Sequence, residues 1–192
     1  MFIKLVSIAF LAVTIATRAF ASTCGEPLSE RIEEADLIAV GTVSRVLRID
    51  AGPPVIEVAE ITIDTVLAVG TLPAGLGSKL RRGGKIRVES EAGIWASPWQ
   101  GIPAIWFLNT NGEQLVRRVC RSPEPMPSTI ESTDRLLDEL DRPVSEAMVV
   151  RPPSLLEKAH ARTAVLARYL KSQRDHLPIR EHDMINVVSL PR

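Results

Sequence analysis

Two cysteines, Cys24 and Cys120, are the residues of this chain with the clearest chemistry. If the chain is exported, two thiols most simply form a disulfide, because oxidising compartments form and keep such bonds. A redox centre is not indicated, since the cysteines do not form a Cys-x-x-Cys pair. Closing a loop of about 95 residues could contribute on the order of 4 kcal/mol to stability in the chain-entropy treatment. The pair therefore predicts a structural bridge from the start of the mature chain to the end of its β-rich region.

The other residues that could do catalytic chemistry do not gather in the sequence. His160, His176 and His182 all lie in the C-terminal region, and no cysteine or acidic cluster completes a metal site with them. A serine hydrolase needs a serine, a histidine and an acid held together, usually with a Gly-x-Ser-x-Gly elbow, and the sequence has no such elbow. We therefore expect no enzyme activity, no metal site of the protein's own and no cofactor.

Residues 1–21 have the three parts of a secretory signal. Lys4 supplies the positive charge, residues 5–17 form an apolar run, and Ala19-Phe20-Ala21 is a small-x-small cleavage site. The run is shorter than the roughly 20 residues that span a bilayer, with an uncleaved anchor as the alternative. We expect cleavage of the signal peptide after Ala21 and export to the periplasm or the extracellular space. Contact with a membrane would then occur only through the transient signal.

The charge balance argues against a nucleic-acid partner. The chain carries 23 basic and 23 acidic residues, and loss of Lys4 and Arg18 with the signal leaves a small acidic excess. Proteins that bind phosphate backbones usually show a basic excess instead. The length allows one domain with a core and an appendage. Aromatic residues make up 4% of the chain, so this core must consist mainly of Val, Ile, Leu and Ala.

Hydrophobic patterning predicts a short helix followed by five strands. Residues 27–34 have helical spacing. The Asn109-Thr110-Asn111-Gly112 segment predicts a hairpin between the last two strands. The predicted strands are the β-branched and aliphatic runs at residues 36–49, 55–69, 85–89, 104–109 and 114–120.

The two longest runs have irregularities that predict bends. Ile56 and Val58 share one parity, whereas the apolar residues from Ala59 to Ile63 have the other, so we expect a bulge in this second run. Gly41 permits a similar bend in the first run. Long bent strands are what a small closed barrel requires. A five-stranded barrel is therefore favoured over a sandwich, which remains the alternative.

Residues 122–127 are typical of a proline-rich linker, and two helices follow. Ser128-Thr129-Ile130-Glu131 is a capping-box pattern, and it predicts a helix that ends near Asp141. A second helix is predicted over residues 154–175, and its two sides differ in polarity. Its apolar stripe would pack on the barrel, which we favour, or its basic side would lie on an anionic membrane or partner. The stripe consists of Leu155, Leu156, Ala159, Thr163, Leu166, Ala167 and Leu170, and the basic side of Lys158, Arg162, Arg168, Lys171 and Arg174.

Several segments match the pattern of one known domain family. They are Ser22-Thr23-Cys24 followed by Pro27, the strands at residues 35–43 and 61–67, the strand entry at residues 101–108, and Cys120. With the order of the elements, they resemble the netrin-like domain family and, within it, the tissue inhibitors of metalloproteinases and their bacterial relatives. The resemblance covers about residues 22–141. It implies a mainly β (α+β) fold, a five-stranded OB-like Greek-key barrel with flanking helices over residues 22–142. Residues 143–192 would be a C-terminal helical extension and tail.

The resemblance also implies a mode of action. In the animal inhibitors, the free α-amine and carbonyl of the first residue chelate the zinc of a target metalloproteinase, and the second side chain enters its specificity pocket. Carried over here, Ser22 would chelate the target's zinc and Thr23 would be the pocket residue. Cys24 and Cys120 match a bridged pair of the family. The family's first cysteine is replaced by Ser22, so the bridge that fixes the terminal residue is missing.

Trp95 and Trp99 are the remaining candidate contact residues. They flank Ser97-Pro98 in a loop that the family fold places beside the N-terminal segment. They could contact a protease together with Ser22 and Thr23, or they could fill the core, which we favour.

The sequence predicts an exported, non-enzymatic protein-interaction domain that resembles the tissue inhibitors of metalloproteinases. Its partner would be another protein, and in the specific form a zinc metalloprotease inhibited through the mature N-terminus. The alternative is a structural or docking module of the cell envelope with no inhibitory activity. Oligosaccharide binding on the barrel face is a third alternative, which the scarcity of aromatic residues does not favour.

Overall fold

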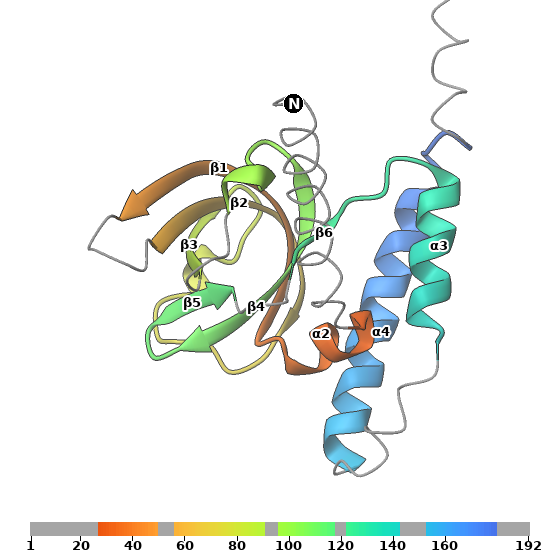
Figure 1. Cartoon of the computed structure of the whole chain (residues 1–192). Helices are drawn as coiled ribbons and strands as arrows, with labels where there is room; N and C mark the ends of the chain where they lie inside the picture. Colours follow the sequence, from red (N-terminus) through yellow and green to blue (C-terminus); the bar gives the residue numbers. More distant parts are fainter. Residues whose placement is uncertain (1–26, 50–55, 91–95, 118–121, 143–152, 180–192) are drawn as a thin grey trace, which may run out of the picture.

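A six-stranded sheet with helices on one side forms the described part of the chain (Figure 1). The computed structural model describes residues 27–49, 56–90, 96–117, 122–142 and 153–179. The predicted combination of a sheet with flanking helices is confirmed. The helices are α2 (Leu28–Glu34), α3 (Ile130–Leu140) and α4 (Pro153–Arg174), with the short 3-10 helices η1 (Gly77–Lys79) and η2 (Ser97–Trp99). The strands are β1 (Leu37–Ile49), β2 (Ile56–Val69), β3 (Lys85–Ser90), β4 (Pro103–Asn111), β5 (Gln114–Arg117) and β6 (Glu124–Pro125).

Five of the strands pair in a ring. Antiparallel ladders join β1 to β2 and β2 to β3, a parallel ladder joins β3 to β5, and antiparallel ladders join β5 to β4 and β4 back to β1. All five predicted strands and the β4–β5 hairpin are confirmed within the described residues. The sixth strand, β6, pairs with β4 and lies in the segment expected to be a linker. Its two residues are too few to show an alternating pattern, which is why the sequence missed it.

The close approach of β1 to β2 explains the glycine in the first strand. The register between the two strands shifts at three places, one of them between Val40 and Gly41, as the glycine predicted. A Cβ atom on Gly41 would lie 2.5 Å from the carbonyl oxygen of Thr62, so a side chain there would force the strands apart.

The bulge predicted between Val58 and Ala59 is wrong. Burial alternates regularly from Ile56 to Ile63, and the register shifts on β2 lie later, at Asp64 and Leu67. Glu57 points inward, like the apolar residues Ala59 and Ile61, so the strand alternates without a bulge.

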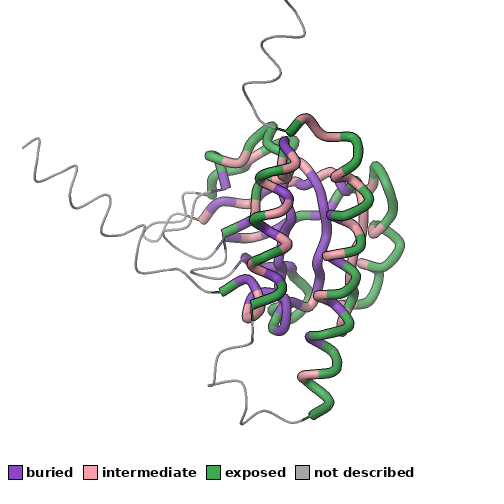
Figure 2. Tube along the Cα trace, turned by 90° about the vertical axis from the view of Figure 1, so that its right-hand side faces the viewer, coloured by how far each residue is buried: buried purple, intermediate pink, exposed green. Residues whose placement is uncertain are grey.

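Two apolar cores share β1 and β4. The inner core lies within the ring, and the outer core lies between the sheet and the three helices; in Figure 2 the outward turns of the helices are exposed while the strands behind them are buried. The inner core includes Leu37, Ala39, Val43, Ile61, Ile86, Val88, Trp106 and Leu108. The outer core includes Leu28, Ile32, Ile38, Val40, Ile105, Phe107, Leu136, Leu140, Leu166 and Leu170.

The helices cover the outer face of β1 and β4. The N-cap of α3 is Thr129, whose side chain forms a capping box with Ser132. The predicted capping box of Ser128 and Glu131 is therefore displaced by one residue. The packing of α4 on the sheet and its neighbouring helices is confirmed, since Leu166 and Leu170 are fully buried in the outer core. The predicted boundary after residue 142 stays a prediction, but α4 lies beyond it and shares this core.

Arg162 is buried and does not belong to the exposed basic side of α4. Its Nη1 donates to the carbonyl oxygens of Ile32, Glu33 and Ala35, at 3.2, 3.1 and 2.5 Å, where α2 ends. The last carbonyls of a helix have no partner within the helix, so this guanidinium satisfies them. Burial lowers the pKa of Arg162, and the nearby Asp36 carboxylate opposes that shift.

We predict that Arg162→Met lowers the free energy of unfolding by about 3 kcal/mol, because buried carbonyls at the end of α2 lose a charged donor. Arg168→Met is the matched control on the same helix, because Arg168 is exposed, and it should change stability by less than about 0.5 kcal/mol. Urea denaturation of both variants measures the difference. Equal effects would mean that Arg162 does not hold α2 and α4 together.

Candidate functional site

Most of the residues proposed as a functional site lie outside the described residues. These are Ser22, Thr23, Cys24, Trp95 and Cys120, together with the signal at residues 1–21. The predicted disulfide, chelating terminus and cleavage site therefore stay predictions.

Trp99 is the one proposed contact residue within the described part of the chain. It lies in η2, is partly buried and packs against the inner core. Its ring meets the ring of Trp106 edge to face, with the centroids 6.4 Å apart. Trp106 Nε1 in turn donates to the carbonyl oxygen of Gly41 at 3.0 Å. The favoured interpretation, that Trp99 fills the core, is confirmed, and its contact with a protease stays a prediction.

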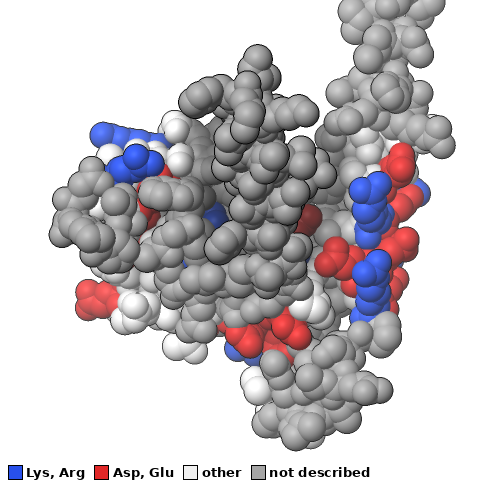
Figure 3. Space-filling view, in the orientation of Figure 1, with Lys and Arg blue, Asp and Glu red and all other residues white. Residues whose placement is uncertain are grey.

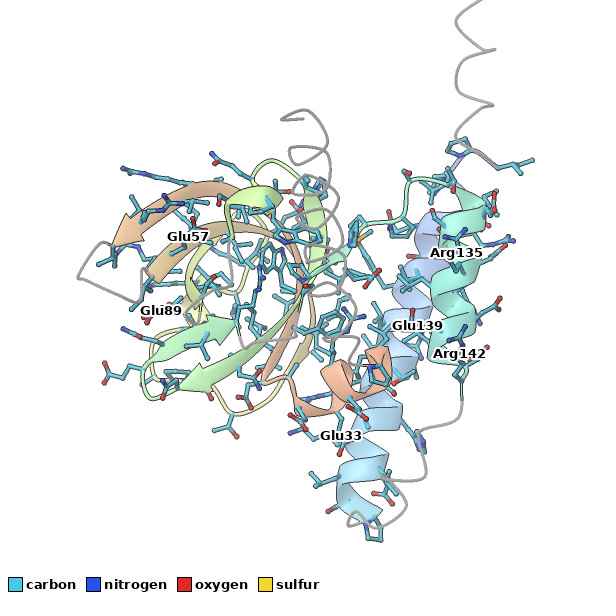
Figure 4. All side chains as sticks on the ribbon, viewed as in Figure 1. Glu33, Glu57, Glu89, Arg135, Glu139 and Arg142 are labelled. Atoms are coloured by element: carbon cyan, nitrogen blue, oxygen red, sulfur yellow. The ribbon has the colours of Figure 1, made fainter. Side chains whose placement is uncertain are left out.

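Glu57 holds η2 against the sheet. Oε2 accepts hydrogen bonds from the backbone N–H groups of Ala96 and Ser97, at 2.6 and 3.0 Å. Oε1 accepts from Ser97 Oγ at 3.1 Å and from Arg48 Nη2 at 3.3 Å. The side chain is 1% exposed, and Figure 4 shows it on β2 beneath η2. We call Glu57, Arg48 and Ser97 the Glu57 clamp.

The electrostatics of the clamp depend on these hydrogen bonds. Burial alone would raise the pKa of Glu57, but the N–H groups of Ser97 and Ala96, the Ser97 hydroxyl and Arg48 outweigh it and hold the pKa below its usual value. Burial lowers the pKa of Arg117 to about 10, and the Glu57 carboxylate opposes this shift. Glu57 and Arg117 are therefore both charged at neutral pH, although both residues are buried.

The clamp positions a loop and does not form a nucleophilic centre. Ser97 donates its hydroxyl to a carboxylate. A serine nucleophile would instead need a base that can take the proton away. His160 lies on α4 and His176 just after it, and both are exposed. The clamp therefore fixes the position of η2, whose Trp99 packs against the inner core.

Sequence reasoning missed the clamp although a signal was present. Glu57 has the same parity as Ala59, Ile61 and Ile63, which are buried apolar residues of β2. A charged residue at a core position of a strand indicates a buried ion with fixed partners. We interpreted the same feature as a bulge, which moved Glu57 to the surface.

Comparison with known proteins leaves the family unassigned. No protein-family model matches the chain, and no curated protein matches it significantly. Within the described residues, no three His, Cys, Asp or Glu side chains are grouped as a metal site would require. Over the same residues, none of the helices combines the length and the apolar character needed to cross a bilayer.

We predict that Glu57→Gln lowers the free energy of unfolding at pH 7 by about 3 kcal/mol, because it removes the charge that compensates buried Arg117. Glu60→Gln is the matched control on the same strand, since Glu60 pairs with exposed Lys85 at 2.8 Å, and it should have little effect. Chemical denaturation followed by tryptophan fluorescence measures both.

The stabilisation by Glu57 should depend on pH with a defined sign. Because the folded pKa lies below the ordinary value of 4.5, the contribution is complete above that value and is lost as the pH falls through the folded pKa. Unfolding free energies measured from pH 7 down to pH 2 should therefore fall less steeply for Glu57→Gln than for the parent protein. Parallel curves would show that the clamp carboxylate is not the group responsible.

Proposed function

We propose that this chain is an exported, non-enzymatic protein-interaction domain of the netrin-like kind, in which the ring of strands forms a five-stranded OB-like Greek-key barrel. The order of the pairings carries the proposal. It runs β1-β2-β3-β5-β4 and returns to β1, with the single parallel ladder between β3 and β5. This order suits a small Greek-key barrel with bent first strands.

The described neighbours of the two cysteines support a disulfide. Arg31 Nη1 donates to the carbonyl oxygen of Ser122 at 3.0 Å, and its Nη2 pairs with Glu124 at 3.1 Å. Cys120 precedes Ser122 by two residues, and Cys24 precedes Pro27 by three. The described segments that adjoin the two cysteines in the sequence are thus held together through Arg31, which supports the proposed bridge.

The specific form of the proposal is inhibition of a zinc metalloprotease through the mature N-terminus. Cleavage after Ala21 would free the amine of Ser22, and zinc in a catalytic site accepts a nitrogen donor at its open position. The terminus would then extend from α2, whose Leu28 and Ile32 are fully buried in the outer core. A firmly packed helix would limit the entropy lost when the few residues before it become ordered on a target.

The alternative is a docking module of the cell envelope without inhibitory activity. The outer side of α3 supports it, because that side carries interspersed charges of both signs, including Arg135, Glu139 and Arg142 (Figures 3 and 4). Such a module would bind its partner whether or not the N-terminal amine is free.

We predict that the secreted protein begins at Ser22 and that its two cysteines are bridged, so intact mass spectrometry should give the mass of residues 22–192 less two hydrogens. The mature protein should slow peptide cleavage by a zinc metalloprotease, with thermolysin as the first to be assayed within a panel. One alanine added before Ser22 should abolish this inhibition, because the amine can no longer reach the zinc.

Ser22→Ala is the matched control, because it changes the same residue but keeps the free amine and the carbonyl, so inhibition should persist. A start at any other residue contradicts chelation by Ser22. Inhibition that survives the added alanine contradicts it as well and leaves the docking module as the function.

A further inference from the structure

A groove with a volume of about 540 Å³ crosses the outward face of the sheet away from the helices. Its apolar lining includes Leu47 and Ile49 of β1, which are 36% and 48% exposed, and Val58 of β2. On β2, Val58 has the parity opposite to that of Ala59 and Ile61, which belong to the inner core. Exposed aliphatic side chains on the wall of a groove are typical of a binding surface.

One rim of the groove is strongly basic. The segment Lys79–Arg87 carries five exposed cations, and the sequence has no acidic residue between positions 65 and 88. Three of these cations line the groove directly, and two lie beside them in the chain. The lining cations are Lys79, Lys85 and Arg87, and the neighbours are Arg81 and Arg82.

Three acidic residues also line the groove, namely Glu60, Glu89 and Glu113. Glu60 accepts a hydrogen bond from Lys85 at 2.8 Å and lies opposite Arg87 across the strands. Glu89 and Glu113 line the groove toward β5. The lining therefore carries three cations and three carboxylates, and Glu89 lies opposite Val58 across the strands. The excess positive charge beside the groove comes from Arg81 and Arg82, within residues 79–87.

This distribution of charge selects among possible ligands. A phosphodiester chain or an anionic lipid surface is negative throughout and would be repelled by Glu89 and Glu113. An extended peptide alternates its side chains, so its acidic residues can face one side only. The strands β1, β2, β3 and β5 span roughly 14 Å at about 4.8 Å spacing, which is the length of about four extended residues.

We infer that this groove binds an extended acidic segment of a partner protein, with its aliphatic side chains on Leu47, Ile49 and Val58 and its carboxylates toward the rim at residues 79–87. The inference rests on the proposed function because it names the chemistry of the protein partner. It names other residues than Ser22 and Thr23, so variants can test the two interactions separately.

The test is fluorescence anisotropy with the mature full-length protein and a labelled eight-residue peptide that alternates Glu and Leu. It should bind at least about tenfold more tightly than the matching Gln–Leu peptide, and added salt should weaken the binding. The double variant Lys79→Ala/Arg87→Ala should lose about tenfold in affinity. The matched control, Lys158→Ala/Arg168→Ala, removes two exposed cations of α4 and should bind like the parent.

Three outcomes would overturn the inference. The first is equal binding of the Gln–Leu and Glu–Leu peptides. The second is unchanged peptide binding by the Lys79→Ala/Arg87→Ala variant with intact circular dichroism. The third is tighter binding of phosphatidylglycerol vesicles or a thymidine oligonucleotide than of the Glu–Leu peptide, lost in the same variant. The protein with an alanine added before Ser22 separates this inference from inhibition, because it should still bind the Glu–Leu peptide like the parent.

Discussion

The antiparallel pairing of β1 with β4 is the constraint on which the rest of the structure depends. Residues Leu37–Thr42 pair with β4 on one edge and with β2 on the other, so their main-chain groups are hydrogen-bonded within the sheet. A core covers each face of this segment, so it has apolar side chains on both faces. Leu37 and Ala39 enter the inner core, whereas Ile38 and Val40 enter the outer core. The same ladder closes the ring and provides the surface on which the helices pack.

Three charged side chains join helices and strands that also pack in the two cores. Arg162 joins α4 to the end of α2, Arg31 joins α2 to Glu124 of β6, and Glu57 joins β2 to η2. Arg31 also lies over the ring of Phe107, with its Cζ atom 5.3 Å from the centroid. Apolar packing is not directional, whereas a buried charge needs its donors or acceptors at fixed positions, because each lost hydrogen bond leaves a costly unpaired group.

The arrangement separates two surfaces that a partner could use. The helices cover the outer face of β1 and β4, and α2 is packed in the outer core through Leu28 and Ile32. The groove is lined by residues of β1, β2, β3 and β5, and in Figure 1 the helices lie on the other side of β4 from β3 and β5. The proposed inhibition and the proposed groove interaction use different residues, so variants can alter them independently.

Local pattern in the sequence determined which segments are helices and strands. The periodicity of α2 and α4, the turn residues around the β4–β5 hairpin and Gly41 in β1 all led to the observed elements, because these signals act between near neighbours. Only the tertiary structure decided that Glu57 and Arg162 are buried and that two residues form β6. The reason is physical: a buried charge is tolerated, and a two-residue strand forms, only where distant segments supply the partners. Those partners lie 39 residues away for Glu57 and 127 for Arg162.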